Sequence, residues 1–322
     1  MFRKVLVTGG AGFIGSNFLL RMVPRYPQTQ FINLDQLTYA ADLTRLQGIC
    51  GCPNYSFLQG DIADETTVVK IMKEGVDAIV NFAAHSHVDR SIISPRDFID
   101  TNICGCFILL EAARHSKIKR FLQISTDEVY GSLGKKGFFS EESPLAPNNP
   151  YSAGKAAADC LTRSYYKTYG LPALITRSTN NYGPYQHREK FIPTIIHNAL
   201  CDELVPLYGD GRQIRDWIYV EDHCRALEQV LLRGKPGRIY NIGANEERTN
   251  LELAGSILHI LGKSPSLLRF IDDRPGHDRR YALATGRIRK ELGWRPHFDL
   301  ETALSRTVAW YVQKFQAAAT KE

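Results

Sequence analysis

Two adjacent carboxylates, Asp127 and Glu128, follow a short apolar run that predicts a buried strand at residues 121–124. Ligands of doubly wound α/β folds bind outside the carboxyl ends of parallel strands, so we expect this pair at the mouth of a site. If their surroundings separate the two pKa values, one carboxyl group can donate a proton while the other removes one. The pair therefore predicts acid–base chemistry of the kind that eliminates water, with a solvated surface turn as the alternative.

Tyr151 and Lys155 form a second reactive pair, which follows a proline-rich loop at residues 144–150. On a helix these two positions share one face, a single turn apart. We expect the ammonium group to lower the pKa of the phenol, so that a phenolate could take a proton from a sugar hydroxyl during hydride transfer. The Tyr-x-x-x-Lys spacing is common by chance, but it gains weight from its position about 25 residues after Thr126.

A cofactor site is predicted by the strand-like run at residues 4–8, by the glycines Gly9, Gly12 and Gly15, and by the helical run that follows them. These glycines allow a tight turn, a close approach of the backbone to a pyrophosphate and a close helix contact, while the helix N-terminus favours phosphates. Asp35 ends the next apolar run, 20 residues after Gly15. A carboxylate there can bond both ribose hydroxyls and would repel a 2′-phosphate, which favours NAD over NADP.

Later strand ends offer further cofactor contacts. Asp61 and Ile62 lie at the end of a predicted strand and could hold an adenine ring, although Asp61 could equally cap the next helix. The small residues at 83–84 would let a cofactor pass close to the sheet. The following His85 and His87 have no third ligand nearby, so no metal site is predicted.

The composition argues against several classes of protein. The chain has 322 residues, 43% hydrophobic and 23% charged, which is enough to bury one large core or two modest ones. A net charge of +6 without a dense Lys/Arg run disfavours a nucleic-acid surface. No stretch reaches 18 apolar residues, and the seven cysteines lack the spacing of zinc sites or disulfide frameworks. We therefore expect a cytoplasmic protein with free thiols, with neither a membrane nor a nucleic acid as partner.

Strand-like and helix-like runs alternate through the first half of the chain, which predicts a Rossmann-type doubly wound parallel sheet of the α/β class. Long helices are predicted at about 95–114 and 151–169, and a strand near 238–243 is expected to return to the cofactor sheet. The predicted division is an NAD-binding domain of residues 1–179 plus about 211–245, and a smaller α/β substrate-binding domain of about 180–210 plus 246–322.

These motifs together resemble one enzyme family. The chain is similar over nearly its whole length to the extended short-chain dehydrogenase/reductases, and most closely to the nucleotide-sugar 4,6-dehydratases of the dTDP-glucose type. The Asp-Glu pair after Thr126 is the discriminating motif, because epimerases of the superfamily generally lack it. The resemblance is carried by the glycine turn, His87–Ile92, Ser125–Gly131, Tyr151–Lys155, Asn180–Pro184, Gln213–Trp217 and Asp273–Tyr281.

The resemblance implies a reaction in which the cofactor finishes oxidised, as it began. Tyr151, aided by Thr126 and Lys155, would remove the O4 proton while hydride leaves C4 for NAD⁺. Glu128 would then take the C5 proton while Asp127 protonates the departing 6-hydroxyl. Hydride returns to C6 and C5 is reprotonated, which gives a 4-keto-6-deoxy sugar nucleotide and water. Tight NAD retention is expected, because a leaked NADH would strand an intermediate.

The resemblance also implies the binding sites. The cofactor site is expected to comprise Gly9, Gly12, Phe13, Ile14, Gly15, Asp35, Gln36, Leu37, Thr38, Asp61, Ile62, Ala83, Ala84, His85, Thr101, Tyr151 and Lys155. Contacts to the nucleotide sugar are expected from His87, Thr126, Asn180, Lys190, Phe191, Ile192, Pro206, Tyr208, Arg215, Asn250, Arg274 and His277.

Three of these positions also have ordinary structural explanations. Asn180 could cap a turn, and Asn250 could cap the helix that it begins. Arg215 could form a salt bridge to Asp216 or Glu221 in place of a bidentate phosphate contact.

His85 stands where bacterial dTDP-glucose enzymes typically carry glutamate, so the nucleotide base stays open. Thymine and uracil differ by one methyl group, which is worth about 1–2 kcal/mol of discrimination. We expect dTDP-glucose as the substrate, with UDP-glucose or another NDP-hexose as the alternative.

Two other functions remain as rivals, a UDP-sugar 4-epimerase or decarboxylase and a noncatalytic NAD-binding regulator. The Asp-Glu pair argues against the first, and its presence together with Tyr151 and Lys155 argues against the second. The family implies a homodimer, with the predicted helices 95–114 and 151–169 as the expected contact.

Overall fold

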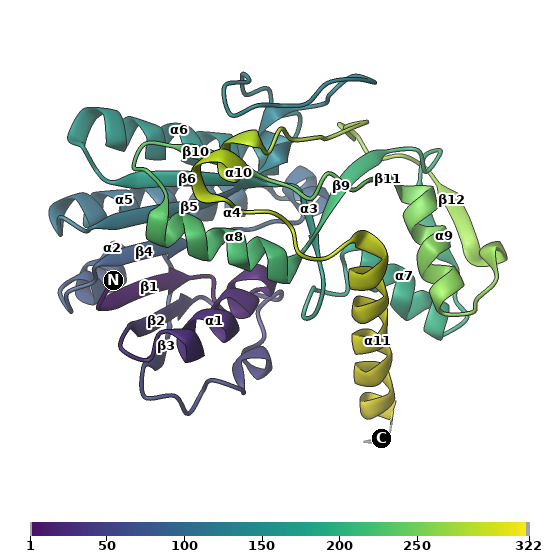
Figure 1. Cartoon of the computed structure of the whole chain (residues 1–322), viewed down its shortest axis with the longest axis horizontal. Coiled ribbons are helices and arrows are strands. Elements are labelled where there is room, and N and C mark those ends of the chain that lie inside the picture. The colour runs from purple at the N-terminus through teal and green to yellow at the C-terminus, as the bar shows by residue number, and fades with distance from the viewer. Residues whose placement is uncertain (1, 320–322) are drawn as a thin grey trace.

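A seven-stranded parallel sheet forms the larger part of the computed structural model, which describes residues 2–319 (Figure 1). Residue 1 and residues 320–322, the ends of the predicted domain ranges, lie outside the described residues. The strand order is β10-β6-β5-β4-β1-β2-β3, the doubly wound arrangement that the βα alternation predicted. The strands are β1 (Lys4–Thr8), β2 (Gln30–Asp35), β3 (Tyr55–Gln59), β4 (Ala78–Asn81), β5 (Arg120–Thr126), β6 (Ala173–Ser178) and β10 (Ile239–Ile242).

Apolar side chains leave the sheet on both faces, because successive residues of a strand point to opposite sides. In β1, Val5 and Val7 belong to one hydrophobic core and Leu6 to the other. The first core is closed by α1 (Phe13–Arg25), α8 (Val220–Arg233) and α10 (Gly286–Leu292). The second is closed by α2 (Glu65–Met72), α5 (Cys106–His115) and α6 (Pro150–Tyr169).

The helix predicted at 95–114 is present but is not uniformly α-helical. It runs as α4 (Pro95–Ile99), a π-helical segment η2 (Asp100–Gly105) and α5, and the short α3 (Val88–Ile93) precedes it. The remaining short turns are 3₁₀-helical, η1 (Leu43–Leu46), η3 (Asp127–Tyr130) and η4 (Pro265–Leu267).

A smaller part of the molecule lies beside the carboxyl ends of the large sheet (Figure 1). It holds a three-stranded sheet, a two-stranded sheet and a separate core to which Ile195, Trp217, Ile257 and Leu304 belong. Its elements are β7 (Asn180–Tyr182), β9 (Ile214–Tyr219), β11 (Glu247–Thr249), β8 (Val205–Tyr208), β12 (Leu268–Ile271), α7 (Phe191–Leu200), α9 (Asn250–Ile260) and α11 (Leu300–Ala319).

The chain crosses between the two parts more than once. β10 pairs with β6, which confirms the predicted return of that strand to the large sheet. β9 lies within the predicted cofactor range 211–245 but pairs with β7 and β11 in the three-stranded sheet. The predicted division into two domains stays a prediction.

All seven cysteines are free, as expected. Within residues 2–319, no helix combines the length and apolar character needed to cross a bilayer.

Candidate active site

The glycine turn joins β1 to α1 and leaves the first helical N–H groups facing a pocket. Gly9 has φ +69°, and a Cβ atom there would lie 2.6 Å from the backbone nitrogen of Ala83. A Cβ on Gly15 would lie 2.3 Å from the carbonyl oxygen of Gly9. The helix begins after Gly12 with no side chain capping it, so its N-terminus is available to an anion. The turn therefore has the form that a pyrophosphate group requires.

Asp35 lies at the end of β2, beside this turn. Its carboxylate accepts hydrogen bonds from the backbone N–H groups of Ala11 and Leu37, both at 2.9 Å. Burial raises the pKa of this carboxyl group, while those two hydrogen bonds and Arg45 oppose the rise. Asp61 is not the helix cap considered above, because Asp64 caps α2. The Asp61 carboxylate accepts a hydrogen bond from the N–H of Ala63 instead.

The two candidate acid–base residues occupy the turn η3 at the end of β5. Thr126 caps this turn by accepting a hydrogen bond from the backbone N–H of Glu128 at 3.3 Å. Asp127 is 2% exposed, and its Oδ2 atom has no hydrogen-bond partner among the described residues. Burial and then the Glu128 carboxylate raise the pKa of Asp127 well above its usual value, while Arg215 opposes them. The predicted separation of roles has a physical basis in this burial, because Asp127 is favoured as the proton donor.

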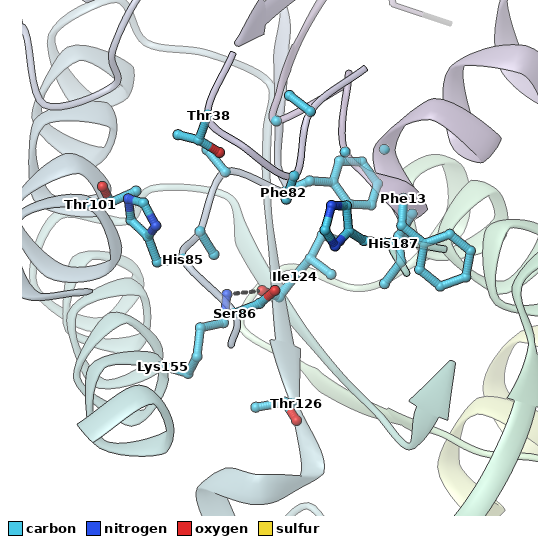
Figure 2. A pocket seen from close by; sticks show the side chains of 18 of the residues that line it. Phe13, Thr38, Phe82, His85, Ser86, Thr101, Ile124, Thr126, Lys155 and His187 are labelled. Carbon is cyan, nitrogen blue, oxygen red and sulfur yellow. Dashed lines mark hydrogen bonds between the residues drawn. The ribbon is translucent and has the colours of Figure 1, made fainter. Parts of the chain in front are cut away.

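Tyr151 and Lys155 lie on α6 against the end of β5, and both are buried. The Lys155 ammonium donates a 2.6 Å hydrogen bond to the carbonyl oxygen of Ile124 (Figure 2). The expected lowering of the phenol pKa is not found in this arrangement. Burial and then the Glu128 carboxylate raise the pKa of Tyr151, and a hydrogen bond to Thr126 opposes them. The Lys155 ammonium interacts with the Ile124 carbonyl oxygen and with the charge of Asp159 instead. Burial lowers the pKa of Lys155, and the Asp159 carboxylate opposes this lowering.

One pocket joins the glycine turn to the catalytic residues. Every residue predicted for the cofactor lines it except Leu37, whose backbone supports Asp35. All five predicted catalytic residues line the same pocket, together with Asn180 and Lys190 from the predicted substrate set. His85 and Thr101 project into it from one wall and Phe13 and His187 from the other (Figure 2). The backbone of His85 is fixed by two hydrogen bonds to the side chain of Asn102, at 3.0 and 3.1 Å.

Sequence reasoning missed part of this lining. The missed polar residues are Ser86, Ser125, Ser178, Thr179, Asn181, Gln186, His187 and Glu189. Ser178 and Thr179 lie at the end of β6 and could have been found, because they occupy the same sheet edge as Thr126. The loop before α7 has no such signal, since only tertiary packing brings His187 and Glu189 to the pocket.

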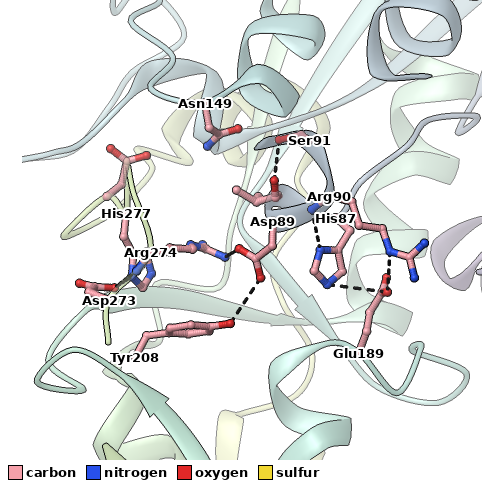
Figure 3. Close-up of polar contacts among 12 residues, drawn as sticks. His87, Asp89, Arg90, Ser91, Asn149, Glu189, Tyr208, Asp273, Arg274 and His277 are labelled. Atoms are coloured by element: carbon pink, nitrogen blue, oxygen red, sulfur yellow. Dashed lines mark hydrogen bonds and ion pairs between the residues drawn. The ribbon is translucent and has the colours of Figure 1, made fainter. Parts of the chain in front are cut away.

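Three of the remaining predicted substrate residues, Tyr208, Arg274 and His277, lie together at or beside a loop at residues 273–277, outside the residues that line this pocket (Figure 3). Asp89 accepts hydrogen bonds from Arg274 and from the Tyr208 hydroxyl, both at 3.4 Å. His277 pairs with Asp273 at 2.6 Å.

His87 and the first residues of α7 take structural positions. The His87 ring accepts a hydrogen bond from the Arg90 N–H at the start of α3 and lies 3.7 Å from Glu189. Ile192 is buried in the smaller core and Phe191 stacks on Trp217, so the start of α7 reaches the pocket through its N-cap residue, Lys190.

Arg215 is buried and forms none of the salt bridges considered for it. Its guanidinium donates to the carbonyl oxygens of Ile214 and Asp278, both at 2.8 Å, and lies 4.4 Å from the centre of the Tyr281 ring. Burial lowers the pKa of Arg215, and the carboxylates of Glu128 and Asp127 are among the groups that oppose this. Arg215 therefore lies within electrostatic reach of the catalytic turn.

Arg274 and Lys190 complete a group of cations near that turn. The positive charge of Arg274 lowers the pKa of both Arg215 and Lys190. Burial is the main cause that lowers the pKa of Lys190. The Lys190 ammonium donates a hydrogen bond to the carbonyl oxygen of Ser86 at 2.8 Å. Arg274 is therefore within electrostatic reach of both Arg215 and Lys190.

Two predicted substrate residues have less direct positions. Pro206 lies in β8, on the same strand as Tyr208. Asn250 starts α9, but Thr249 provides the cap in a capping box with Glu252, so the cap considered for Asn250 is wrong. Within residues 2–319, no group of three or more His, Cys, Asp or Glu residues could hold a metal ion.

Comparisons with known proteins assign the chain to a family. Residues 6–307 match the protein family described as GDP-mannose 4,6 dehydratase. A dTDP-glucose 4,6-dehydratase from Xanthomonas campestris is 48% identical over 326 residues, covering 95% of this chain and 92% of the relative. The low-salt glycan biosynthesis protein Agl12 from Haloferax volcanii is 50% identical over 308 residues, covering 96% and 98%.

A solved structure extends the similarity to the whole fold. DesIV, a dTDP-glucose 4,6-dehydratase from Streptomyces venezuelae with NAD and TYD bound, has a TM-score of 0.95 at 46% identity and covers 98% of both chains. The predicted fold class and the resemblance are confirmed. By sequence and by fold, the chain belongs to the nucleotide-sugar 4,6-dehydratases of the extended short-chain dehydrogenase/reductase family.

Proposed function

We propose that this protein is an NAD-dependent dTDP-glucose 4,6-dehydratase, which forms dTDP-4-keto-6-deoxyglucose and water. The observation that carries the proposal is one pocket lined by both the glycine turn and the Thr126–Glu128 turn, with Tyr151 and Lys155 beside them. A redox cofactor and an acid–base pair are thereby brought to one substrate. The names of the relatives support the same activity.

The described residues fit NAD. Gly9 and Gly15 allow the tight packing of the turn that places the α1 N-terminus beside the pocket, where its N–H groups can meet a pyrophosphate. Asp35 is positioned to bond ribose hydroxyls and to repel a 2′-phosphate. Bound NAD⁺ supplies the hydride acceptor for C4 oxidation and the hydride donor for the return to C6.

In the first step, Tyr151 takes the O4 proton of glucose while hydride leaves C4. Burial and the Glu128 carboxylate raise the pKa of the phenol, so Tyr151 must lose its own proton to solvent before it can accept the O4 proton as a phenolate. The Thr126 hydroxyl opposes this rise through its hydrogen bond to Tyr151. Lys155 adds a buried positive charge on the same helix face. The resulting 4-ketone acidifies the proton at C5.

In the second step, water leaves across C5 and C6. Glu128 removes the C5 proton, and Asp127 gives its proton to the departing 6-hydroxyl. Burial keeps Asp127 protonated at a pH where an exposed aspartate would be ionised, because its pKa is raised. Hydride then returns to C6 and a proton to C5, so the cofactor ends oxidised.

The nucleoside diphosphate is held by cations of the smaller part of the molecule. Arg215, Arg274 and Lys190 supply positive charge near the catalytic turn. Tyr208 and His277 lie beside Arg274 and bound the space expected for the nucleoside (Figure 3). The remaining predicted contacts, His87, Asn180, Phe191, Ile192, Pro206 and Asn250, are part of the same proposal.

Mass spectrometry of the product tests the activity. The purified protein is incubated separately with dTDP-glucose and UDP-glucose, without added reductant. We expect a product lighter by one water from dTDP-glucose, formed faster than from UDP-glucose. Faster loss of water from UDP-glucose would reassign the base, and a product of unchanged mass that is the C4 epimer would replace the dehydratase by an epimerase.

We further propose a homodimer located in the cytoplasm, with the predicted division into a cofactor domain and a substrate domain. Exposed apolar side chains on α4, α5 and α6 support the dimer, namely Ile99, Phe107 and Tyr169. Seven free cysteines are consistent with a reducing compartment.

A further inference from the structure

A buried chain of polar side chains connects the catalytic helix α6 to the catalytic turn η3. Arg177, on β6, donates a 2.8 Å hydrogen bond from Nε to Asp159 on α6. Its Nη1 donates a 2.9 Å hydrogen bond to the hydroxyl of Tyr130, the last residue of η3. Tyr130 in turn donates to Asn241 on β10 at 2.8 Å. All four residues are buried.

These hydrogen-bonded side chains connect the two groups of residues that the proposed reaction uses. Asp159 lies on α6, one helical turn after Lys155, and its carboxylate raises the pKa of Lys155. The same helix carries Tyr151. Tyr130 belongs to the same four-residue turn as Asp127 and Glu128. Arg177 stands between them because β6 lies next to β5 in the sheet.

The surroundings of Tyr130 restrict its position further. Its ring stacks on Phe139 with the centroids 5.0 Å apart, and the Arg177 guanidinium lies 4.8 Å from its centre. Asn241 also donates a 3.1 Å hydrogen bond to the carbonyl oxygen of Phe139. Through its hydroxyl, Tyr130 connects the end of the turn to β6 by its hydrogen bond from Arg177 and to β10 by its hydrogen bond to Asn241.

Arginine is suited to this place because its planar fork can bind two acceptors at a fixed angle, which lysine cannot do. Moving the Arg177 guanidinium away would leave the buried Asp159 carboxylate without its ion-pair partner, which is costly, so the guanidinium resists movement. The pair Asp159–Arg177 has side chains that are 1% and 4% exposed.

We propose that Asp159, Arg177 and Tyr130 are positioning residues that fix the acid–base turn relative to the Tyr151–Lys155 helix. This inference rests on the proposed dehydratase function. It assigns a role in the elimination step to residues that line no part of the pocket.

Tyr130→Phe is the informative variant, because it removes the hydroxyl and keeps the ring and its stacking. Tyr151 and Lys155 keep their helix, and Lys155 keeps its bond to Ile124. Oxidation at C4 should therefore stay within about twofold of wild type, whereas elimination should slow roughly tenfold or more, since small misplacements of catalytic groups have effects of this size. Enzyme-bound NADH should then accumulate transiently, as seen by its absorbance after rapid mixing with dTDP-glucose.

Tyr240→Phe is the matched control. Tyr240 is also buried, on β10, and its hydroxyl both accepts from the Lys235 N–H and donates to Glu291. It packs in the core on the opposite face of the sheet from α6. Tyr240→Phe should leave the ratio of elimination to oxidation unchanged, even if it lowers the melting temperature as much as Tyr130→Phe does.

Arg177→Lys tests whether the hydrogen bonds that join Asp159, Arg177 and Tyr130 act as one unit. The single variant should also slow elimination, and the double variant with Tyr130→Phe should be no slower than the worse single variant, because both break one linkage. Multiplying effects, an unchanged ratio in Tyr130→Phe, or the same change in Tyr240→Phe would each overturn the positioning role. If the wild-type protein formed no dehydrated product, the proposed function would fail instead, and the positioning role with it.

Discussion

Two neighbouring carboxylates differ in this protein because only one of them is fully buried. Asp127 is enclosed and carries an Oδ2 atom without a partner among residues 2–319, whereas the Glu128 carboxylate accepts a 3.3 Å hydrogen bond from Ser152 and is partly exposed. Burial favours the neutral form of a carboxyl group, which is the form that donates a proton. In the proposed mechanism, depth of burial therefore divides the roles of acid and base.

Substituting either carboxylate should separate oxidation from elimination. We expect Asp127→Asn and Glu128→Gln to slow formation of the dehydrated product roughly a hundredfold or more, the usual worth of a general acid or base. C4 oxidation should change much less, so bound NADH should build up on mixing with substrate. Tyr151→Phe should impair both steps. Wild-type rates of product formation in both carboxamide variants would show that these roles are wrong.

The raised pKa of Asp127 also predicts how stability depends on pH. Between the unfolded and the folded pKa of this group the native state binds more protons than the unfolded chain, so its contribution to stability falls as pH rises. Asp127→Asn removes this dependence. Chemical denaturation should show the variant gaining stability over wild type from about pH 4 to about pH 8. A stability difference that is the same at both pH values would contradict the shift.

The element that depends most strictly on its sequence is the turn between β1 and α1. Gly9 and Gly15 are required by contact with backbone atoms, which cannot move aside as a flexible side chain can. The π-helical segment η2 is another specialised element, because it carries Thr101 into the pocket and Asn102 against His85. Both elements position groups that line or support the pocket.

Gly15→Ala should abolish NAD retention and destabilise the fold, because the new methyl group would lie 2.3 Å from the Gly9 carbonyl oxygen. Gly255→Ala is the matched control, since it lies inside α9 with no atom within 4 Å of the added Cβ. That variant should gain about 0.5–1 kcal/mol from better helix propensity. NAD content of the purified proteins and thermal unfolding measure both effects. Equal NAD content in the two variants would contradict the role given to the turn.

The proposed site lies where the large sheet meets the smaller, separately packed core. The large sheet supplies the cofactor pocket and the acid–base turn, while the smaller part supplies Arg215 and Arg274. Neither part alone contains both a redox site and the cations for a diphosphate.

Phe107→Lys should weaken the dimer, because Phe107 is 46% exposed on α5 and a buried lysine at a contact would be costly. Light scattering after gel filtration should show a dimer for wild type and a larger monomer fraction for the variant. Ile93→Lys is the control, since Ile93 is 85% exposed at the end of α3, outside the predicted contact. A monomeric wild-type protein would contradict the proposed assembly.

Local periodicity and fixed spacing were enough to predict the doubly wound sheet, the glycine turn and the reactive pairs. The same patterns predicted that Asp127 and Glu128 follow a strand. The folded structure was needed to show which of the two is buried, that Lys155 bonds to Ile124, and that Thr249 caps α9. Burial and hydrogen-bond partners depend on residues far apart in the chain, such as Arg215 beside the catalytic turn, and no local pattern encodes those contacts.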